Sequence, residues 1–307
     1  MKIRVLGSAA GGGFPQWNCN CRNCAGLRRG TLRALARTQS SLAVRGDDDA
    51  AAWVLVNASP DVRAQLTACP DLQPGRAPRD TAIAAIVLVD AQLDHTTGLL
   101  MLREARAPLR VWCTDRVHAQ LTDANPVFTV LGHYCGIERR AMSAAGDEFE
   151  VERVPGVGWR ALAVPAGAPP YAGSRAAQHS GEQVALVMRD TATQRSAVYA
   201  PGLGAMTGEV WQAMQAAACV LIDGTFWSDD EMTSQGLSAR SALAMGHLPL
   251  SGRGGMLEWL ERLPSATRRI LIHVNNTNPV LDEDSPERAT LARAGVEVAW
   301  DGLEIEL

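Results

Sequence analysis

The sequence has 307 residues, of which 47% are hydrophobic and 20% are charged, and its formal net charge is −4. Such a chain has ample apolar material for a large core, and the absence of any run of Lys and Arg excludes a broad basic surface for nucleic acid. No signal-peptide core is found, and the longest apolar run, residues 82–89, has about a third of the length that crosses a bilayer, so we expect a cytoplasmic protein without a membrane segment.

The N-terminal half alternates strand-like and helix-like segments. Two of its strands are expected on either side of an acidic turn at residues 46–49. The run at residues 83–90 is continuously β-branched and aliphatic, which is typical of a strand buried on both faces. The elements predicted in this half are strands at 2–6, 41–45, 53–57, 83–90 and 110–114, and helices at 62–69 and 99–103.

The C-terminal half repeats this alternation. The elements predicted there are strands at 184–188, 196–199, 219–223 and 269–273, and helices at 208–217, 240–245 and 254–263. The tail, residues 296–307, is predicted as two alternating strands about the turn Asp301-Gly302. No internal repeat or low-complexity linker divides the chain. We therefore expect one α/β domain, residues 1–307, of packed sheets covered by helices.

Three cysteines lie within six residues, at Cys19, Cys21 and Cys24. Three thiolates so close together can converge on one tetrahedral Zn²⁺ if a fourth ligand comes from elsewhere. The chain has seven cysteines, and an odd number with a tight cluster favours metal binding over disulfides in a reducing compartment. The alternative is a set of reduced cysteines in a surface loop. We predict a structural zinc site that fixes the loop at about residues 11–30 to the body.

A glycine-rich segment, residues 7–13, precedes these cysteines. It lacks the Lys-Ser/Thr of a P-loop and the spacing of a dinucleotide-binding fingerprint. The segment therefore predicts a close-packed backbone turn and not a phosphate site.

Polar side chains follow the ends of three apolar strands. Asp90-Ala-Gln-Leu-Asp-His95 follows one strand, Asp223 ends another, and His273 ends a third. α/β folds tend to build their sites at such strand ends. Charged or imidazole groups are costly there unless they are paired or bound to metal, although a capping Asp and a satisfied His would also explain the pair Asp94-His95. We predict a metal site around Asp94 and His95.

These segments resemble the metallo-β-lactamase superfamily and, far more closely, the pyrroloquinoline quinone (PQQ) biosynthesis protein B family. The closer resemblance spans essentially the whole chain. It is carried by the motifs at residues 7–21, 37–41, 57–61, 94–99, 199–203, 223–225 and 273–279. The resemblance implies an αββα sandwich, in which two mixed sheets are flanked by helices.

The superfamily holds two metals with the pattern HxHxDH, followed along the chain by a His, an Asp and a final His. Asp90 and Gln92 stand here in place of the first two histidines, whereas Asp94 and His95 match the pattern. The later ligand positions of the pattern are matched by His179, Asp223 and His273.

The two replaced histidines bind one of the two metals in the superfamily. The resemblance therefore implies that this chain binds that metal poorly and that a two-metal hydrolase mechanism is disfavoured. The other metal keeps two histidines and one carboxylate, with Asp223 as a bridging residue. That is the ligand set of non-haem Fe(II) oxygenases. We therefore predict Fe(II) at the active site, where zinc can substitute, held by Asp94, His95, Asp223, His273 and His179.

The resemblance further implies iron-dependent hydroxylation of the tyrosine ring in the cross-linked Glu-Tyr precursor of PQQ. This precursor is a small, multiply anionic molecule, and other proteins of the PQQ pathway are candidate partners. Two alternatives stay open. One is a carrier or export protein that binds PQQ or its precursor without catalysis, and the other is a residual zinc hydrolase, which the replaced histidines disfavour.

Further residues are expected around the metal. His247 resembles a position that carries a histidine beside the reacting group in phosphodiesterase and tRNA-processing relatives. We predict that it acts in proton transfer or hydrogen bonding, together with Asp90 and Gln92 as candidate catalytic residues, and a structural histidine is the alternative. Arg37 and Arg240 are candidates for binding substrate carboxylates, because Arg pairs with carboxylates in a bidentate manner.

The same relatives complete their three-cysteine zinc site with a residue three positions after the final histidine. Asn276 occupies that position here, and an amide is a poor zinc ligand. We predict that Asn276 is the fourth ligand beside the three cysteines, with Cys113 as the alternative.

Overall fold

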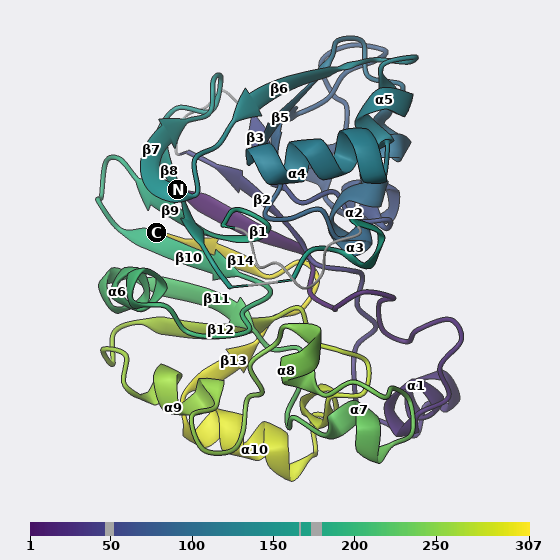
Figure 1. Ribbon diagram of the computed structural model, residues 1–307, viewed down its shortest axis with the longest axis vertical. Coiled ribbons are helices and arrows are strands. Elements are labelled where there is room, and N and C mark those ends of the chain that lie inside the picture. The colour runs from purple at the N-terminus through teal and green to yellow at the C-terminus, as the bar shows by residue number, and fades with distance from the viewer. Residues whose placement is uncertain (47–51, 166, 173–179) are drawn as a thin grey trace.

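Two seven-stranded sheets pack face to face in the computed structural model, which describes residues 1–46, 52–165, 167–172 and 180–307 (Figure 1). The order of the first sheet is β14-β1-β2-β3-β4-β5-β6, and that of the second is β13-β12-β11-β10-β9-β8-β7. The strands of the first sheet are β1 Lys2–Gly7, β2 Ser41–Arg45, β3 Trp53–Val56, β4 Ile83–Val87, β5 Leu109–Cys113, β6 Ile137–Ala141 and β14 Glu304–Glu306. Those of the second sheet are β7 Ala145–Glu150, β8 Val157–Ala163, β9 Val184–Asp190, β10 Ser196–Ala200, β11 Cys219–Asp223, β12 Arg268–Ile272 and β13 Val296–Val298.

Both sheets are mixed, as the resemblance implies. In the first sheet β3 to β6 run parallel to one another, and in the second β10 to β13 do so, whereas the remaining neighbours are antiparallel. Because parallel strands end at the same edge of a sheet, the residues that follow β11 and β12 come together. The edge formed in this way carries the polar residues singled out in the sequence.

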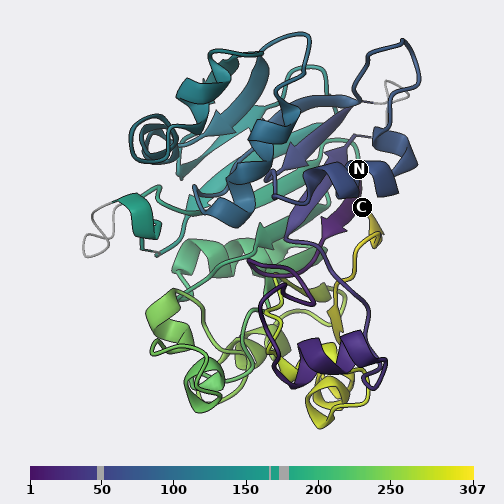
Figure 2. The ribbon, with the colours of Figure 1, turned by 90° about the vertical axis from the view of Figure 1, so that its right-hand side faces the viewer.

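Helices cover the outer faces of the two sheets (Figures 1 and 2). The apolar residues of α2 Val62–Ala68, α4 Asp115–Ala119 and α5 Val127–Leu131 pack on the first sheet. Those of α6 Gly208–Ala216, α9 Met256–Glu261 and α10 Pro286–Arg293 pack on the second. The remaining α-helices are α1 Arg22–Arg29, α3 Leu93–Thr96, α7 Glu231–Ser234 and α8 Ala242–Met245. This arrangement confirms the αββα sandwich.

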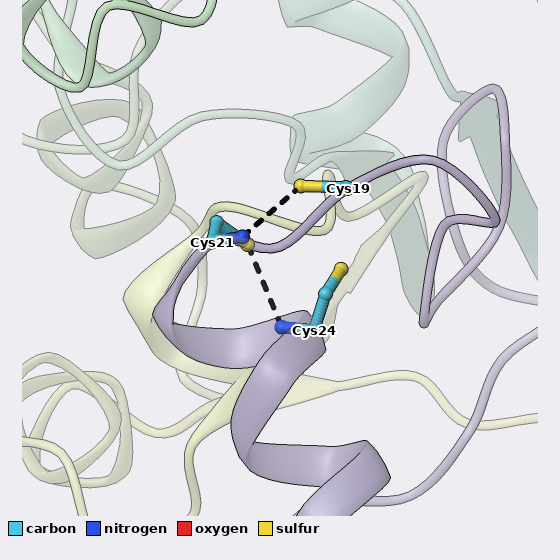
Figure 3. A group of neighbouring side chains, drawn as sticks. All are labelled: Cys19, Cys21 and Cys24. Carbon is cyan, nitrogen blue, oxygen red and sulfur yellow. Dashed lines mark hydrogen bonds between the residues drawn. The ribbon is translucent and has the colours of Figure 1, made fainter.

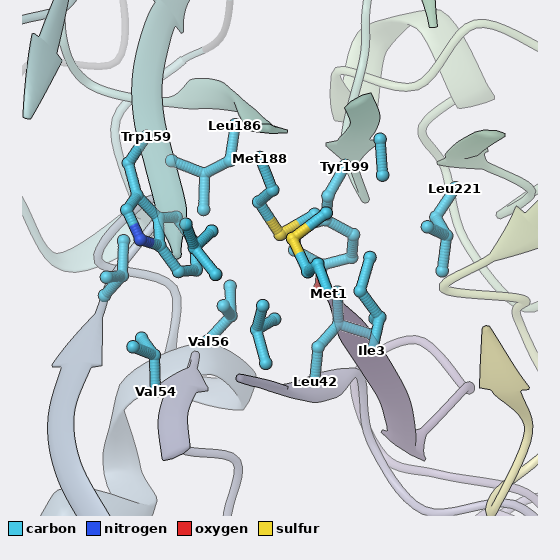
Figure 4. Close-up of a cluster of buried hydrophobic side chains, with 14 of the residues drawn as sticks. Met1, Ile3, Leu42, Val54, Val56, Trp159, Leu186, Met188, Tyr199 and Leu221 are labelled. Atoms are coloured by element: carbon cyan, nitrogen blue, oxygen red, sulfur yellow. The ribbon is translucent and has the colours of Figure 1, made fainter. Parts of the chain in front are cut away.

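An apolar layer joins the two sheets (Figure 4). Ile3, Leu42 and Val56 point inward from the first sheet, and Trp159 and Leu221 meet them from the second. Full burial of a side chain such as Val, Leu or Ile stabilises a protein by about 1.5–3 kcal/mol relative to exposure. The layer therefore holds the two sheets in a fixed register, and with them the strand ends that carry the site.

The chain leaves the first sheet earlier than the run at residues 83–90 predicts. β4 ends at Val87, and the following residues cross to the second sheet: the amide of Val184 donates to Val89 O at 2.9 Å, and Asp90 forms an isolated bridge with Gln183. This crossing places Asp90 between the two sheets.

Other predicted elements differ in detail. The helix expected at 99–103 is a 3₁₀-helix, Thr97–Leu102. The strands of the tail do not pair with each other, because β13 joins the second sheet and β14 the first. The turn Asp301-Gly302 therefore connects two layers, and the carboxylate of Asp301 fixes it by accepting from the amide and hydroxyl of Thr38. The acidic turn predicted at 46–49 lies mostly outside the described residues.

Among the residues that the structure describes, no helix is both long enough and apolar enough to cross a membrane.

Candidate metal centre

Asp94, His95 and His273 converge on one point at the edge between the two sheets. Each of the three offers a ligand atom, and these atoms lie within 4.8 Å of one another. Oδ2 of Asp94 is 3.2 Å from Nε2 of His273 and 3.8 Å from Nε2 of His95. The short helix α3 supplies Asp94 and His95, and the residue that follows β12 supplies His273. Two imidazoles and one carboxylate are thus brought together from segments about 180 residues apart in sequence.

Asp90 holds the ring of His95. Nδ1 of His95 lies 2.8 and 2.9 Å from the two carboxylate oxygens of Asp90, and both side chains are buried. Because an ionised carboxylate only accepts hydrogen bonds, Nδ1 of His95 carries the proton that is shared with Asp90. Nε2 is then the ring nitrogen that can bind a metal. That Nε2 is buried without a hydrogen-bond partner in the described structure. A buried ring nitrogen that faces the carboxylate of Asp94 and has no hydrogen-bond partner is well placed to bind a metal ion. Metal-binding histidines are commonly supported by a carboxylate on their other ring nitrogen, as Asp90 supports His95 here.

Thr225 holds the ring of His273 in a similar way. The Thr225 hydroxyl donates to Oδ1 of Asp223 at 2.6 Å, and its oxygen lies 2.9 Å from Nδ1 of His273. Since the hydroxyl proton is directed to the carboxylate, Nδ1 of His273 donates to Thr225 and Nε2 again faces Asp94. The backbone of His273 is in the left-handed region, with φ of 59°, which a non-glycine residue rarely adopts.

His247 is the third histidine at this edge. Its Nδ1 donates to Oδ2 of Asp223 at 2.8 Å, and its ring stacks on that of His273 with centroids 5.5 Å apart. Asp223, His247 and His273 also have ligand atoms within 4.8 Å of one another. Asp223 is fully buried, and its two oxygens additionally accept from the amides of Leu203 and Thr225. Four hydrogen bonds therefore occupy this carboxylate.

The electrostatics of the cluster favour a cation. Burial alone would raise the pKa of Asp94, but the neighbouring His95 and the hydrogen bond from His273 hold that pKa well below its usual range. Burial alone would lower the pKa of His95, yet Asp90 and Asp94 raise it to about 9. Three carboxylates thus surround three histidines in a buried pocket, so positive charge is stabilised there, whether as protons or as a metal ion.

The glycine-rich segment packs against the cluster, as predicted for a close-packed turn. A Cβ atom on Gly11 would lie 3.3 Å from Oδ2 of Asp94, and one on Gly7 would lie 2.0 Å from the carbonyl oxygen of Gln39. The amide of Ala10 donates to Val274 O, and that of Val274 donates to Ser8 O. The segment therefore fixes the backbone beside His273.

The remaining predicted site residues are distributed differently. Gln92 is the N-cap residue of α3, and its backbone N–H donates to Oδ1 of Asp90. Arg240 is exposed and donates to the carbonyl of Ala244, within α8. His179 lies outside the described residues.

The structure corrects the assignment of Arg37 to substrate binding. Its side chain is buried, and Nη1 donates to the hydroxyl of Ser8 and to the carbonyl of Ala299. Burial also lowers its pKa to about 10. The guanidinium therefore ties the glycine-rich segment to the C-terminal tail, and these contacts bury it within the fold.

The three cysteines gather at the start of α1 (Figure 3). Their sulfur atoms lie within 4.8 Å of one another. Cys21 is the N-cap residue of this helix and accepts from the amide of Cys24 at 3.5 Å. Burial alone would raise the pKa of Cys21, but the amides of Cys24 and Asn23 and the neighbouring thiols lower it. A thiolate at a helix N-terminus is also favoured by the helix dipole. Burial and the neighbouring Cys21 raise the pKa of Cys24 to about 12, so this thiol would lose its proton only when a metal binds.

Asn276 completes this cluster. Its Nδ2 lies 3.1 Å from Sγ of Cys19, 3.6 Å from that of Cys21 and 3.4 Å from that of Cys24. A half-turn of the amide would present Oδ1 to the same point. Cys113, the alternative fourth ligand, is buried in β5 under the helices of the first sheet and does not belong to the group.

Thr225 was not among the predicted site residues, although the motif at 223–225 contains it. Its role depends on two contacts, to Asp223 and to His273, that join residues 48 positions apart. A side-chain hydroxyl two residues after a carboxylate is too common to signal such a role. Only the pairing of β11 with β12 brings the two strand ends together.

We expect Asp90→Ala to weaken binding of the active-site metal by about 10- to 100-fold, because the ring of His95 loses the group that fixes its orientation and protonation. Asp90→Asn should have a smaller effect, since the amide oxygen can still accept from Nδ1. The measurement is an equilibrium titration of the metal-free protein with Fe(II) and Zn²⁺. Asp123→Ala, at an exposed carboxylate, is the matched control, and an Asp90→Ala variant with unchanged affinity would contradict the assignment.

A β-lactamase superfamily domain model matches residues 52–274. Coenzyme PQQ synthesis protein B of Azoarcus sp. (strain BH72) is 62% identical over 307 residues, which cover 100% of both chains. The protein of the same description from Cupriavidus necator (strain H16) is 58% identical over 305 residues, which cover 99% of both.

Solved structures agree with this result. The structure of Zn²⁺-bound PqqB from Methylobacterium extorquens has a TM-score of 0.89 and 35% identity, and it covers 100% of both chains. A diphosphatase from the PhnP family has a TM-score of 0.66 over 100% of this chain and 97% of the other, and at 17% identity it shows the fold alone.

Proposed function

The chain belongs to the coenzyme PQQ synthesis protein B family, within the β-lactamase superfamily, and on this premise we propose that it is a non-haem Fe(II)-dependent hydroxylase of coenzyme PQQ synthesis. The proposed substrate is the tyrosine ring of the cross-linked Glu-Tyr precursor. The names of the relatives support the pathway, and the donor atoms of the metal centre support the chemistry.

One observation carries the proposal of iron. Nε2 of His95, Nε2 of His273 and the carboxylate of Asp94 converge, and each ring is held from its other nitrogen. Two imidazoles and one carboxylate with open positions suit Fe(II) in oxygenases. The protein from Methylobacterium extorquens binds Zn²⁺. Zinc binds many such sites more tightly than Fe(II), so zinc in one member is compatible with iron as the metal that supports turnover.

The side chains of the chain itself would prepare this site. Fe(II) held by Asp94, His95 and His273 would supply the activation of O₂. Asp90 and Thr225 would keep both rings in the tautomer that leaves Nε2 free. The low pKa of Asp94 keeps its carboxylate ionised at neutral pH. Asp94 is therefore already in the form that binds a metal, whereas His95, whose pKa is raised to about 9, would release the proton on its Nε2 when a metal binds.

His247 is the group that we propose for the phenol of the substrate. Because Asp223 accepts from Nδ1, Nε2 of His247 is the nitrogen that can accept a hydrogen bond from, or take a proton from, the phenol. The four hydrogen bonds of Asp223 support a role in holding His247 and Thr225 in place. Arg240 stays a proposal for substrate binding and Gln92 for a catalytic residue. Asp223 and His179 stay proposals for further metal ligands. Asn276 stays the proposed fourth ligand of the cysteine zinc site.

The decisive experiment is reconstitution. The metal-free active site is loaded with Fe(II) without oxygen, and the cross-linked Glu-Tyr precursor, ascorbate as the reductant and then O₂ are added. One oxygen atom enters the ring, and the other leaves as water with two electrons from the reductant. We expect a dihydroxyphenyl product heavier by one oxygen atom, with the label of ¹⁸O₂, measured by mass spectrometry.

The same protein loaded with Zn²⁺ is the control and should give no product, because zinc has no redox chemistry. Absence of product from the iron-loaded protein, together with tight binding of precursor or finished PQQ, would reject the hydroxylase and favour the carrier. Equal product from the zinc-loaded protein would reject the role of iron.

A further inference from the structure

A cavity lies at the opposite end of the first sheet from the metal centre. Its volume is about 1000 Å³. It is lined by the N-terminal parts of β4 and β5, by the loop at residues 73–82 and by the segment at 101–110. β4 and β5 are parallel, and the metal centre lies beyond the carboxyl end of β4. The length of the strand therefore separates the two sites, and the proposed function does not use this cavity.

The floor of the cavity is apolar. Leu66, Leu72, Ile83 and Leu109 line it, together with Met101, which is 49% exposed. A long apolar side chain that stands at the mouth of a cavity is covered when an apolar ligand binds. The volume is at the upper end of the range of small-molecule sites.

The rim of the cavity carries an excess of positive charge. Five arginines and three carboxylates line it. Three of the arginines form ion pairs: Arg76 with Asp80 at 2.8 Å, Arg110 with Glu138 at 3.0 Å and Arg79 with Glu104 at 3.8 Å. Arg106 and Arg153 make no hydrogen bond or ion pair within the described part of the chain. Two guanidinium groups are thus available at the edge of an apolar cavity in a protein whose net charge is −4.

Arg153 has an unusual backbone. Its φ is 70°, in the left-handed region, which is unfavourable for a side chain that is neither Gly, Asn nor Asp. Such a conformation persists only when the surrounding structure holds it, and strained residues of this kind cluster at ligand clamps and functional sites. The strained turn presents a guanidinium group to the rim of the cavity.

We propose that this cavity binds an amphipathic small-molecule carboxylate. The apolar body lies on the floor and covers Met101, and the carboxylate pairs with Arg106 and Arg153. A guanidinium group suits such a head group, because its planar N–H donors match the two carboxylate oxygens. The site is separate from the metal centre and takes its ligand whether or not a metal is bound.

The test uses decanoate as the probe, with the full-length protein and isothermal titration calorimetry. Decanoate should bind with a saturable isotherm, whereas decanol and decyltrimethylammonium should bind at least about tenfold more weakly, because they lack the anionic head group. In protein labelled with ¹³C at its methionine methyl groups, the resonance of Met101 should shift on titration. Met214, which is buried under the other sheet, is the internal control.

Variants locate the site. Arg106→Gln with Arg153→Gln should weaken decanoate binding about tenfold or more. Arg253→Gln, at an exposed arginine outside the cavity, should leave it unchanged. Unchanged affinity in the double variant, or equal binding of the cationic probe, would each overturn the proposal.

Discussion

Replacing His95 by alanine is expected to abolish binding of the active-site metal and to reduce the proposed hydroxylation by at least about a thousandfold. The imidazole supplies one of the three ligand atoms that converge with Asp94 and His273 in the described structure, and its Nε2 has no hydrogen-bond partner there. Loss of one ligand from a site with open positions removes most of its affinity, and the oxygen chemistry cannot proceed without the metal. Metal stoichiometry by elemental analysis, together with turnover, measures both effects.

The variant also leaves Asp90 buried without its partner, and an uncompensated buried carboxylate can destabilise a protein by several kcal/mol. His95→Gln is therefore tested beside it, because a glutamine can still donate to Asp90. Zinc at the proposed cysteine site should report on folding within the same sample. His118→Ala is the matched control, since His118 is half-buried, lies outside the metal cluster and has its ring near that of Phe128, with centroids 5.8 Å apart. Full metal occupancy of the active site in either His95 variant would contradict the ligand assignment.

Replacing Cys21 by serine is expected to remove the structural zinc and to lower Tm by at least about 10 °C. Cys21 is both a proposed ligand and the N-cap of α1, and its sulfur lies with those of Cys19 and Cys24 around Asn276. Serine can still cap the helix, so the change isolates the loss of the thiolate. The zinc content should fall by one equivalent, and calorimetry should record the loss of stability.

Cys135→Ser is the control for this prediction, because Cys135 is half-buried and lies outside the cluster. It should keep the zinc and change Tm little. Chelation of zinc from the unaltered protein should reproduce the loss of stability of Cys21→Ser, and it should add no further loss to that variant. Retention of the zinc by Cys21→Ser would show that another set of ligands binds it.

Many strands of the sandwich could be predicted from the sequence. The predicted strands include β4, β10 and β11, whose continuous apolar residues are typical of a buried strand, and the two tail strands β13 and β14 at the sheet edges. The strands that were missed are at or near an edge. β6 and β7 have the sequences IERRA and AGDEFE, and charged residues replace the apolar alternation that signals a strand. Charges protect exposed edges from pairing with other chains, and they also conceal the strand.

Some helices were missed for a related reason. α5 has five residues, and α1 begins at a cysteine N-cap instead of the usual Ser, Thr, Asp or Asn. A helix of one turn has too few residues for a hydrophobic period to appear. Packing against the sheets stabilises such elements, and local sequence does not encode it.

The sequence by itself determined the chemical inventory: a three-cysteine cluster, the pair Asp94-His95 and the strand-end residues Asp223 and His273. These are local patterns, because each ligand type stands beside an apolar strand or within a few residues of another ligand. The tertiary structure alone decided how they are used. Asp90 supports His95, Thr225 links His273 to Asp223, and the buried Arg37 ties the glycine-rich segment to the C-terminal tail. Such contacts depend on which strands pair and on how two sheets face each other, and the residues in contact lie far apart along the chain.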